Sequence, residues 1–282
     1  MTLTVMKKPV SPGVILIQVF LVFWAAIQLY PLFWLALFSL KDNSEIFGGN
    51  IAGFPKIPKW ANYADALRQG GVLTYFLNSV FVSAVTIFLT LLLSSMAAYA
   101  ITRMRWKYNK AAMMYLLLGM MIPVHAALLP LFIVLSKLKL LNSFPALIFP
   151  YVAFGLPLAV FILSGFLSGI PREMEESASI DGANIYRVFF SVILPLARPA
   201  LATVAIFTYL ASWNELMFAV TFISKRELKT ITVGIMSMVG NYVTQWGPIG
   251  AGLMIATIPT IVIYILLSDQ VQKSMIAGAV KG

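Results

Sequence analysis

The sequence has no cysteine, a single histidine and few charged residues, and each shortage argues against a class of structure or site. Without cysteine there is no disulfide framework, no thiolate nucleophile and no cysteine-rich metal site. Cysteine usage therefore does not indicate whether the protein works in an oxidising or a reducing compartment. The histidine, His125, has no Asp or Glu near it in sequence, and one imidazole cannot make a metal site. Charged residues are only 11% of the 282 residues, whereas a soluble domain carries about a quarter. So few charges cannot coat a soluble globule of this size.

Several catalytic motifs are also missing from the sequence. There is no G-x-x-x-x-G-K-[ST] run, so the chain cannot hold ATP phosphates in that manner. The apolar segments contain no paired carboxylates, no HExxH motif and no buried Ser–His set, which argues against a membrane-embedded enzyme. We therefore expect no catalytic residue, no metal and no cofactor in this chain.

What the chain does contain is apolar sequence, with 60% hydrophobic residues and a mean hydropathy of +0.90. A spanning helix needs about 20 apolar residues to cross about 30 Å of hydrocarbon. Six segments meet that test, and the intervening stretch Thr230–Val239 is too short to span. We predict an all-α polytopic membrane protein, residues 1–282 being one transmembrane domain. The predicted spans are about 14–40, 72–102, 111–136, 145–168, 199–223 and 249–268.

The net charge of +10 is spread along the chain in a way that favours a membrane partner over nucleic acid. The basic residues stand singly or in small groups at the ends of apolar runs, as membrane-flanking anchors do. With both termini in the cytoplasm, eleven Lys and Arg lie inside and nine outside. The loop Arg103–Lys110, with four cations in eight residues, is the strongest support for that orientation. We therefore expect contact with lipid, cytoplasmic termini and no nucleic acid.

A polar segment at about 170–198 interrupts the apolar sequence between the fourth and fifth predicted spans. Pro171 suits the first turn of a helix, and the glutamates that follow are favoured there by the helix dipole. Gly182 is a natural stop in the left-handed conformation, and Asn184 can cap a second helix. The segment predicts helix, sharp bend, helix. From these features alone, a docking surface and an ordinary cytoplasmic loop both remain open.

A longer motif in this segment resembles a known signature. The run Glu176-Ser177-Ala178-Ser179-Ile180-Asp181-Gly182-Ala183 is followed by Val192-Ile193-Leu194-Pro195, with nine residues between Gly182 and Val192. This pattern resembles E-A-A-x-x-x-G-x9-I-x-L-P of binding-protein-dependent ABC-importer permeases. Ser177 replaces the commonest alanine and Val192 replaces isoleucine. In that family this loop is where the motor ATPase docks. The resemblance therefore implies ATPase-coupling residues at Glu176, Ser177, Ala178, Asp181, Gly182 and Ala183.

Shorter stretches resemble the carbohydrate importers of this superfamily, the group that includes the smaller permease of the maltose transporter. These stretches are Trp60–Tyr63, Asn78-Ser79, Ala97–Ala100, Met121–Pro123, Ser212–Glu215 and the ending Gly278–Gly282. The resemblance implies a type I ABC-importer permease fold of six helices in the bacterial plasma (inner) membrane. It also implies four partners: a second similar permease, two ATPase subunits that bind the ATP, and an extracytoplasmic solute-binding protein.

The function implied by this resemblance is import of a sugar or oligosaccharide by alternating access. Two alternatives remain open at this point. One is an ABC importer for another solute, such as a glycerol phosphate. The other is an ion-coupled secondary transporter, although such proteins usually carry several buried charges and often inverted repeats.

Polar residues within or beside the spans are candidates for the transport pathway. A charge in mid-membrane costs about 2.5–3.5 kcal/mol, so Glu215 should face a partner or an aqueous cavity unless it lies near the outer interface. We group Trp213 and Asn214 with it. Asn78, near the outer end of the second span, is another pathway candidate, with helix capping as the alternative.

The loop before the last span is a candidate for contact with the binding protein. It carries Asn241, Tyr242, Gln245 and Trp246. Aromatic faces cover the C–H surfaces of sugars while amides bond their hydroxyls. The alternative is a lid that packs on its own helices.

Overall fold

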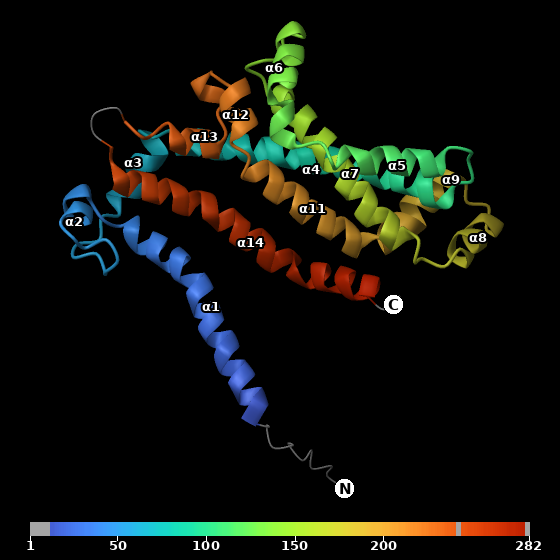
Figure 1. Ribbon diagram of the computed structural model, residues 1–282, viewed down its shortest axis with the longest axis horizontal. Helices are drawn as coiled ribbons and strands as arrows, with labels where there is room; N and C mark the ends of the chain where they lie inside the picture. The colour runs from blue at the N-terminus through green and yellow to red at the C-terminus, as the bar shows by residue number, and fades with distance from the viewer. Residues whose placement is uncertain (1–11, 241–243, 280–282) are drawn as a thin grey trace.

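The computed structural model describes residues 12–240 and 244–279, and the described residues form helices joined by loops (Figure 1). Four helices are long and apolar enough to cross a membrane: α1 (Pro12–Phe38), α4 (Val72–Arg103), α7 (Pro145–Leu167) and α14 (Trp246–Ala279). Two sharply bent pairs of segments pass the same test when each pair is taken together. Counting each bent pair as one span gives six, so the structure agrees with the predicted six-helix membrane fold.

The remaining elements are shorter. They are α2 (Asn43–Phe47), α3 (Ala61–Arg68), α5 (Asn109–Gly119), η1 (Val124–Ala127), α6 (Leu128–Lys137), α8 (Glu173–Ile180), α9 (Ile185–Val188), the π-helical turn η2 (Phe189–Ile193), α10 (Leu194–Leu196), α11 (Arg198–Trp213), α12 (Met217–Phe222), η3 (Arg226–Leu228) and α13 (Ile231–Met236). The short apolar stretch expected not to span contains α13, which packs on α4 and α14.

The segment expected as a third span, 111–136, is broken in the structure. Helix α5 ends at Gly119, and the part that continues through η1 and α6 is bent from it by 88°. Pro123 has an extended backbone (ψ 119°) at the break, and proline has no N–H to continue the helical hydrogen bonds. Helix α6 consequently projects from the bundle in Figure 1, where it packs on α12.

The segment expected as a fifth span, 199–223, is also divided. Helix α11 ends at Trp213, and the six-residue α12 starts only at Met217. On its other side α11 is bent by 76° from the helical stretch Ile185–Leu196. Helix α11 is therefore bounded by a bend before it and a break after it.

Helices α4 and α7 pack side by side and form the centre of the molecule. The buried face of α4 is lined with small side chains at helical spacing, namely Ser79, Ser83, Thr86, Thr90, Ser94 and Ala98. Small residues let helix backbones approach closely, which favours association where lipid supplies little hydrophobic driving force. On α7, a Cβ added to Gly155 would lie 3.7 Å from the side chain of Thr90.

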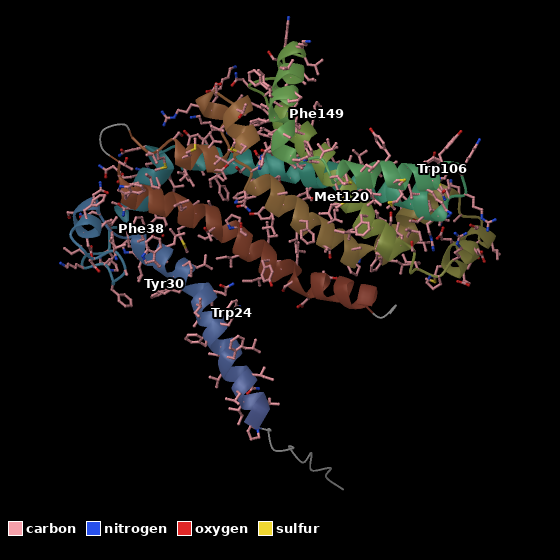
Figure 2. The ribbon with its side chains drawn as sticks, in the orientation of Figure 1. Trp24, Tyr30, Phe38, Trp106, Met120 and Phe149 are labelled. Atoms are coloured by element: carbon pink, nitrogen blue, oxygen red, sulfur yellow. The ribbon has the colours of Figure 1, made fainter. Side chains whose placement is uncertain are left out.

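The exterior of the molecule is strongly apolar. Helix α1 approaches the other helices only near its C-terminal end, and none of its residues is buried (Figure 1). Trp24 and Tyr30 of α1 and Phe149 of α7 point outward, each more than half exposed (Figure 2). This is the surface expected of helices that lie in hydrocarbon.

The loops gather at two opposite ends of the bundle. At one end α8 and α9 lie beside the end of α4 and the start of α5; we call this the elbow end. At the other end lie α2, α3 and α13, with the start of α14; we call this the loop end. Since α4 runs from α3 to α9, it connects the two ends within one helix.

Candidate functional site

The elbow is the segment 173–188, formed by α8, a tight bend and α9. Helix α8 has three glutamates in its first turn, as its dipole favours. The helix ends at Ile180, and Gly182, two residues later, has the left-handed φ (+82°) that was predicted. The Gly182 N–H donates to the Ser179 carbonyl and the Ala183 N–H to the Ala178 carbonyl, both at 3.0 Å. This paired closure is the Schellman motif, which satisfies the last carbonyls of the helix.

The second arm of the elbow starts as the sequence predicts. The Asn184 side chain accepts a hydrogen bond of 2.9 Å from the Arg187 N–H, which caps α9. At the end of α9, Val188 and the following Phe189 are buried against the bundle. The two arms are therefore held by caps at the bend and by apolar packing behind it.

The six coupling candidates divide into two groups in the structure. Glu176, Ser177, Asp181 and Gly182 are exposed. Ala178 and Ala183 instead pack inward against the buried cluster formed by α4, α7 and α9–α11. The small alanines therefore seat the elbow on the bundle, and the polar residues form its outer surface.

Two large apolar side chains on the same outer surface were missed by the sequence analysis. Ile180 is 87% exposed beside the bend, and Tyr186 is 71% exposed on α9. Both fall at variable positions of the signature, so motif matching gave them no weight. The presence of a large aliphatic side chain within a run of small ones was the available signal.

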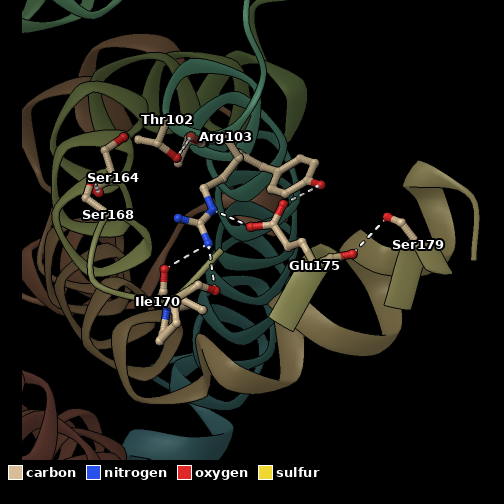
Figure 3. A network of polar contacts seen from close by, with 10 residues as sticks. Thr102, Arg103, Ser164, Ser168, Ile170, Glu175 and Ser179 are labelled. Atoms are coloured by element: carbon tan, nitrogen blue, oxygen red, sulfur yellow. Dashed lines mark hydrogen bonds and ion pairs between the residues drawn. The ribbon is translucent and has the colours of Figure 1, made fainter. Parts of the chain in front are cut away.

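A polar network attaches α8 to the end of α4 (Figure 3). The Arg103 Nε donates to Glu175 Oε1, and the Tyr99 hydroxyl donates to Glu175 Oε2 at 3.3 Å. A second guanidinium nitrogen of Arg103 donates to the carbonyls of Ile170 at 2.9 Å and Pro171 at 3.4 Å. The Arg103 and Glu175 side chains are only 5% and 18% exposed. Because the two residues are 72 positions apart, no local pattern could pair them.

Glu215 lies at the break between α11 and α12, and hydrogen-bond donors surround its carboxylate. Tyr151 of α7 donates its hydroxyl at 2.7 Å, and the N–H groups of Phe218 and Ala219 donate at 2.8 and 3.0 Å. The carboxylate therefore caps α12 and connects it to α7. Glu215 also lines a cavity of about 210 Å³ between α4, α7 and α11.

The residues adjacent to Glu215 face elsewhere. Trp213 is 3% exposed and donates its Nε1–H to the Ala256 carbonyl of α14 at 3.1 Å. It stacks on Tyr209, with ring centroids 5.4 Å apart. Asn214 is exposed and bonds the Leu210 carbonyl of its own helix. Trp213 and Asn214 line a separate cavity of about 520 Å³ beside α13 and α14. The three adjacent candidates therefore do not form one site.

Asn78 attaches the first part of α4 to the loop end. Its amide donates to the carbonyls of Glu227 and Lys229 at 2.8 and 2.9 Å. The neighbouring Ser79 hydroxyl accepts from the Ile231 N–H at 2.8 Å. Asn78 thus holds the segment that leads into α13 from a position inside α4, whose N-cap is Gly71.

The loop-end candidates are only partly described. Asn241 and Tyr242 lie outside the described residues. Gln245 is exposed and lines a polar cavity of about 550 Å³ with Arg226. A hydrogen bond from the Arg226 Nε to the Tyr75 hydroxyl raises the pKa of that guanidinium. Trp246 is 37% exposed at the start of α14, and its N–H donates to the Asn43 side chain at 2.9 Å.

The fold is that of an ABC-importer permease. A chain of a bacterial ABC transporter involved in import of the acidic polysaccharide alginate superposes with a TM-score of 0.79 at 21% identity, covering 93% of this chain and 99% of that one. Residues 90–277 match the family of binding-protein-dependent transport system inner membrane components, and the chain belongs to this family.

Two relatives match along most of the chain. The diacetylchitobiose uptake system permease protein NgcG of Streptomyces coelicolor is 33% identical over 260 residues, 92% of this chain and 86% of the relative. The trehalose/maltose transport system permease protein MalG of Thermococcus litoralis is 31% identical over 280 residues, 98% of this chain and all of the relative. The protein is therefore an inner membrane permease component of an ABC importer, a class that works with an ATPase and a solute-binding protein. This membership excludes the ion-coupled alternative.

Proposed function

We propose that this permease imports a sugar or oligosaccharide by alternating access. The observation that carries the proposal is the near full-length match to permeases named for trehalose, maltose and diacetylchitobiose. In this proposal the chain contributes the passage and the partner subunits bind the ATP. The affinity for solute then resides in the passage and in the solute-binding protein.

The cavity between α4, α7 and α11 has a chemistry that suits an uncharged polyol. It combines aromatic side chains, among them Phe154 and Phe207, with the hydroxyl-bearing residues Thr208 and Ser212 and the Glu215 carboxylate. Its lining residues within the described chain include no Lys or Arg. A carboxylate without a cation repels a phosphate group, so the cavity favours a sugar over a glycerol phosphate.

The exposed face of the elbow is our candidate for the docking surface of the ATPase. Glu176, Ser177 and Asp181 supply its polar part, and Ile180 and Tyr186 supply apolar side chains that a partner would bury. An exposed apolar anchor beside polar residues is the usual anatomy of a binding surface. Two ATPase subunits, one on this chain and one on a second permease, bind the ATP.

The remaining partners are assigned to other surfaces. The loop end, with Gln245 and Trp246 and also Asn241 and Tyr242, receives the solute-binding protein. Helix α1, which is apolar and exposed except near its C-terminal end, lies against lipid and the second permease. The elbow end faces the cytoplasm with both termini, since the cationic loop Arg103–Lys110 is at that end.

Because the natural chain has no cysteine, single thiols can test the orientation directly. Ser179→Cys at the elbow should be labelled by a membrane-impermeant maleimide only after spheroplasts are lysed. Ile57→Cys, at an exposed loop-end residue, should be labelled in intact spheroplasts. The reverse pattern would refute the orientation.

The transport proposal is tested by reconstituting the chain with its second permease, ATPase and binding protein in liposomes. We expect ATP-dependent uptake of radiolabelled trehalose, maltose or diacetylchitobiose and none of glycerol 3-phosphate. Uptake of glycerol 3-phosphate and of none of the sugars would refute the sugar assignment and identify a glycerol phosphate as the solute. Uptake without ATP would contradict the proposal altogether.

A further inference from the structure

The network around Arg103 has features that helix packing alone does not require. The guanidinium bonds the Glu175 carboxylate on α8 and also the carbonyls of Ile170 and Pro171 that precede α8. Its planar fork of donors thus holds α8 at two points, which fixes the direction of the helix as well as its distance. Tyr99, one turn earlier on α4, holds the second carboxylate oxygen.

The burial of this ion pair argues for a role in geometry. The Arg103 side chain is 5% exposed, so the pair has lost most of its water. Buried ion pairs contribute little net stability compared with apolar side chains of the same size. The inward-packed Ala178 and Ala183 already supply apolar contact between the elbow and the bundle. The pair therefore adds orientation to a contact that apolar packing already provides.

Helix α4 is well suited to transmit a movement of α8. It has 32 residues, which corresponds to roughly 48 Å at about 1.5 Å per residue. It contains neither Pro nor Gly, whereas the other long helices α1, α7 and α14 all contain internal proline. Kinks occur mainly at proline and glycine, so α4 is the stiffest of the four. At its far end Asn78 and Ser79 hold the segment that leads into α13.

We propose that Arg103 and Glu175 are positioning residues that join the docking helix α8 rigidly to α4, so that a displacement of α8 by the ATPase reaches α13 at the opposite face. This inference rests on the proposed docking of the ATPase on the elbow. The pair touches neither solute nor ATP. Its loss should leave the ATPase bound and uncouple it from the loop end.

The test uses the reconstituted complex and a fluorescent label on Met236→Cys, an exposed α13 position. A nonhydrolysable ATP analogue should change the fluorescence of the otherwise unaltered protein. Arg103→Met/Glu175→Met removes both charges together, so no unpaired buried charge is left to unfold the chain. We expect normal amounts of bound ATPase and a signal about ten-fold smaller, within the about 5- to 150-fold range of coupling between sites. Arg103→Lys keeps the positive charge but loses the planar set of guanidinium N–H donors, so it should give an intermediate signal.

Lys59→Met provides the matched control, because it breaks the exposed ion pair with Asp42 (2.9 Å) at the loop end. The control should leave both ATPase binding and the signal unchanged. An undiminished signal in both Arg103 variants, or no signal in the unaltered complex with ATPase bound, would overturn the inference. Failure of the unaltered chain to bind the ATPase would instead refute the proposed docking function.

Discussion

The bend at Gly182 allows the docking hypothesis to be tested quantitatively. A Cβ added at Gly182 would meet nothing within 4 Å, so a substitution there causes no clash within the chain. The cost comes from the φ of +82°, which side chains of L-residues rarely adopt. For such residues the left-handed conformation costs about 1–2 kcal/mol, and a β-branched side chain adds to this.

That strain sets the size of the expected effect. One or two kcal/mol corresponds to a factor of about 5–30 in the population of the native bend. If the ATPase binds only the native bend, its apparent affinity falls by the same factor. We expect Gly182→Val, whose β-branched side chain adds strain, to weaken ATPase pull-down and uptake most, Gly182→Ala to weaken both by about this factor, and Gly182→Asn to be mildest, because Asn tolerates this conformation.

The assay is co-purification of the ATPase in detergent, normalised to the amount of permease inserted in the membrane. Gly165→Ala is the matched control, because Gly165 lies inside α7, also has open space at Cβ and has no positive φ. There alanine should stabilise the helix by about 0.5–1 kcal/mol and leave docking unchanged. Normal ATPase co-purification with Gly182→Val would refute the assignment of the elbow as the docking surface.

Three further outcomes follow from the contacts of single side chains. Glu215→Ala removes the cap of α12 and leaves the Tyr151 hydroxyl without its acceptor, so we expect about 2–4 kcal/mol lower stability and impaired uptake with the complex intact. Thermal unfolding in detergent and uptake kinetics check this, and unchanged kinetics would exclude Glu215 from the pathway. Gly234→Ala would place a Cβ 2.0 Å from the Tyr75 ring, so we expect a loss of about 1–3 kcal/mol in the same unfolding assay, and an unshifted midpoint would contradict the packing. Hydrogen bonds from Ser44, Lys59 and the Glu45 N–H lower the pKa of Asp42. The stabilisation of α2 by Asp42 should therefore be full above the unfolded-state pKa of 3.8 and be lost as the pH falls through the lower folded-state pKa. Amide-exchange protection of Glu45 should follow this pH dependence, and Asp42→Asn should abolish the dependence.

The spans and the elbow show what local sequence determines. Uninterrupted apolar length placed α1, α4 and α7 within a few residues, because lipid thickness sets the length of a spanning helix; α14 continues to Ala279, beyond the predicted end at 268. The φ of Gly182 and the cap by Asn184 followed from backbone chemistry at single residues. Hydropathy did not reveal the bend after Gly119, since Met121-Ile122-Pro123 is as apolar as a continuous span.

The roles of the polar residues depended on contacts between distant segments. Glu215 was expected to need a partner or water, but only the packed helices show that Tyr151 and two backbone N–H groups surround it. Trp213 and Asn214 were grouped with it by proximity in sequence, but Trp213 bonds α14 instead, and Asn78, the separate pathway candidate, bonds η3.

Composition, apolar run length and the elbow signature thus determined that this chain is a membrane permease with a polar elbow, because these properties act within a few turns of helix. Only the tertiary structure decided the pairing of Arg103 with Glu175 and the different cavities that Trp213 and Glu215 line. Hydrogen bonds between helices depend on which faces meet after packing, and no pattern within a single helix records that choice.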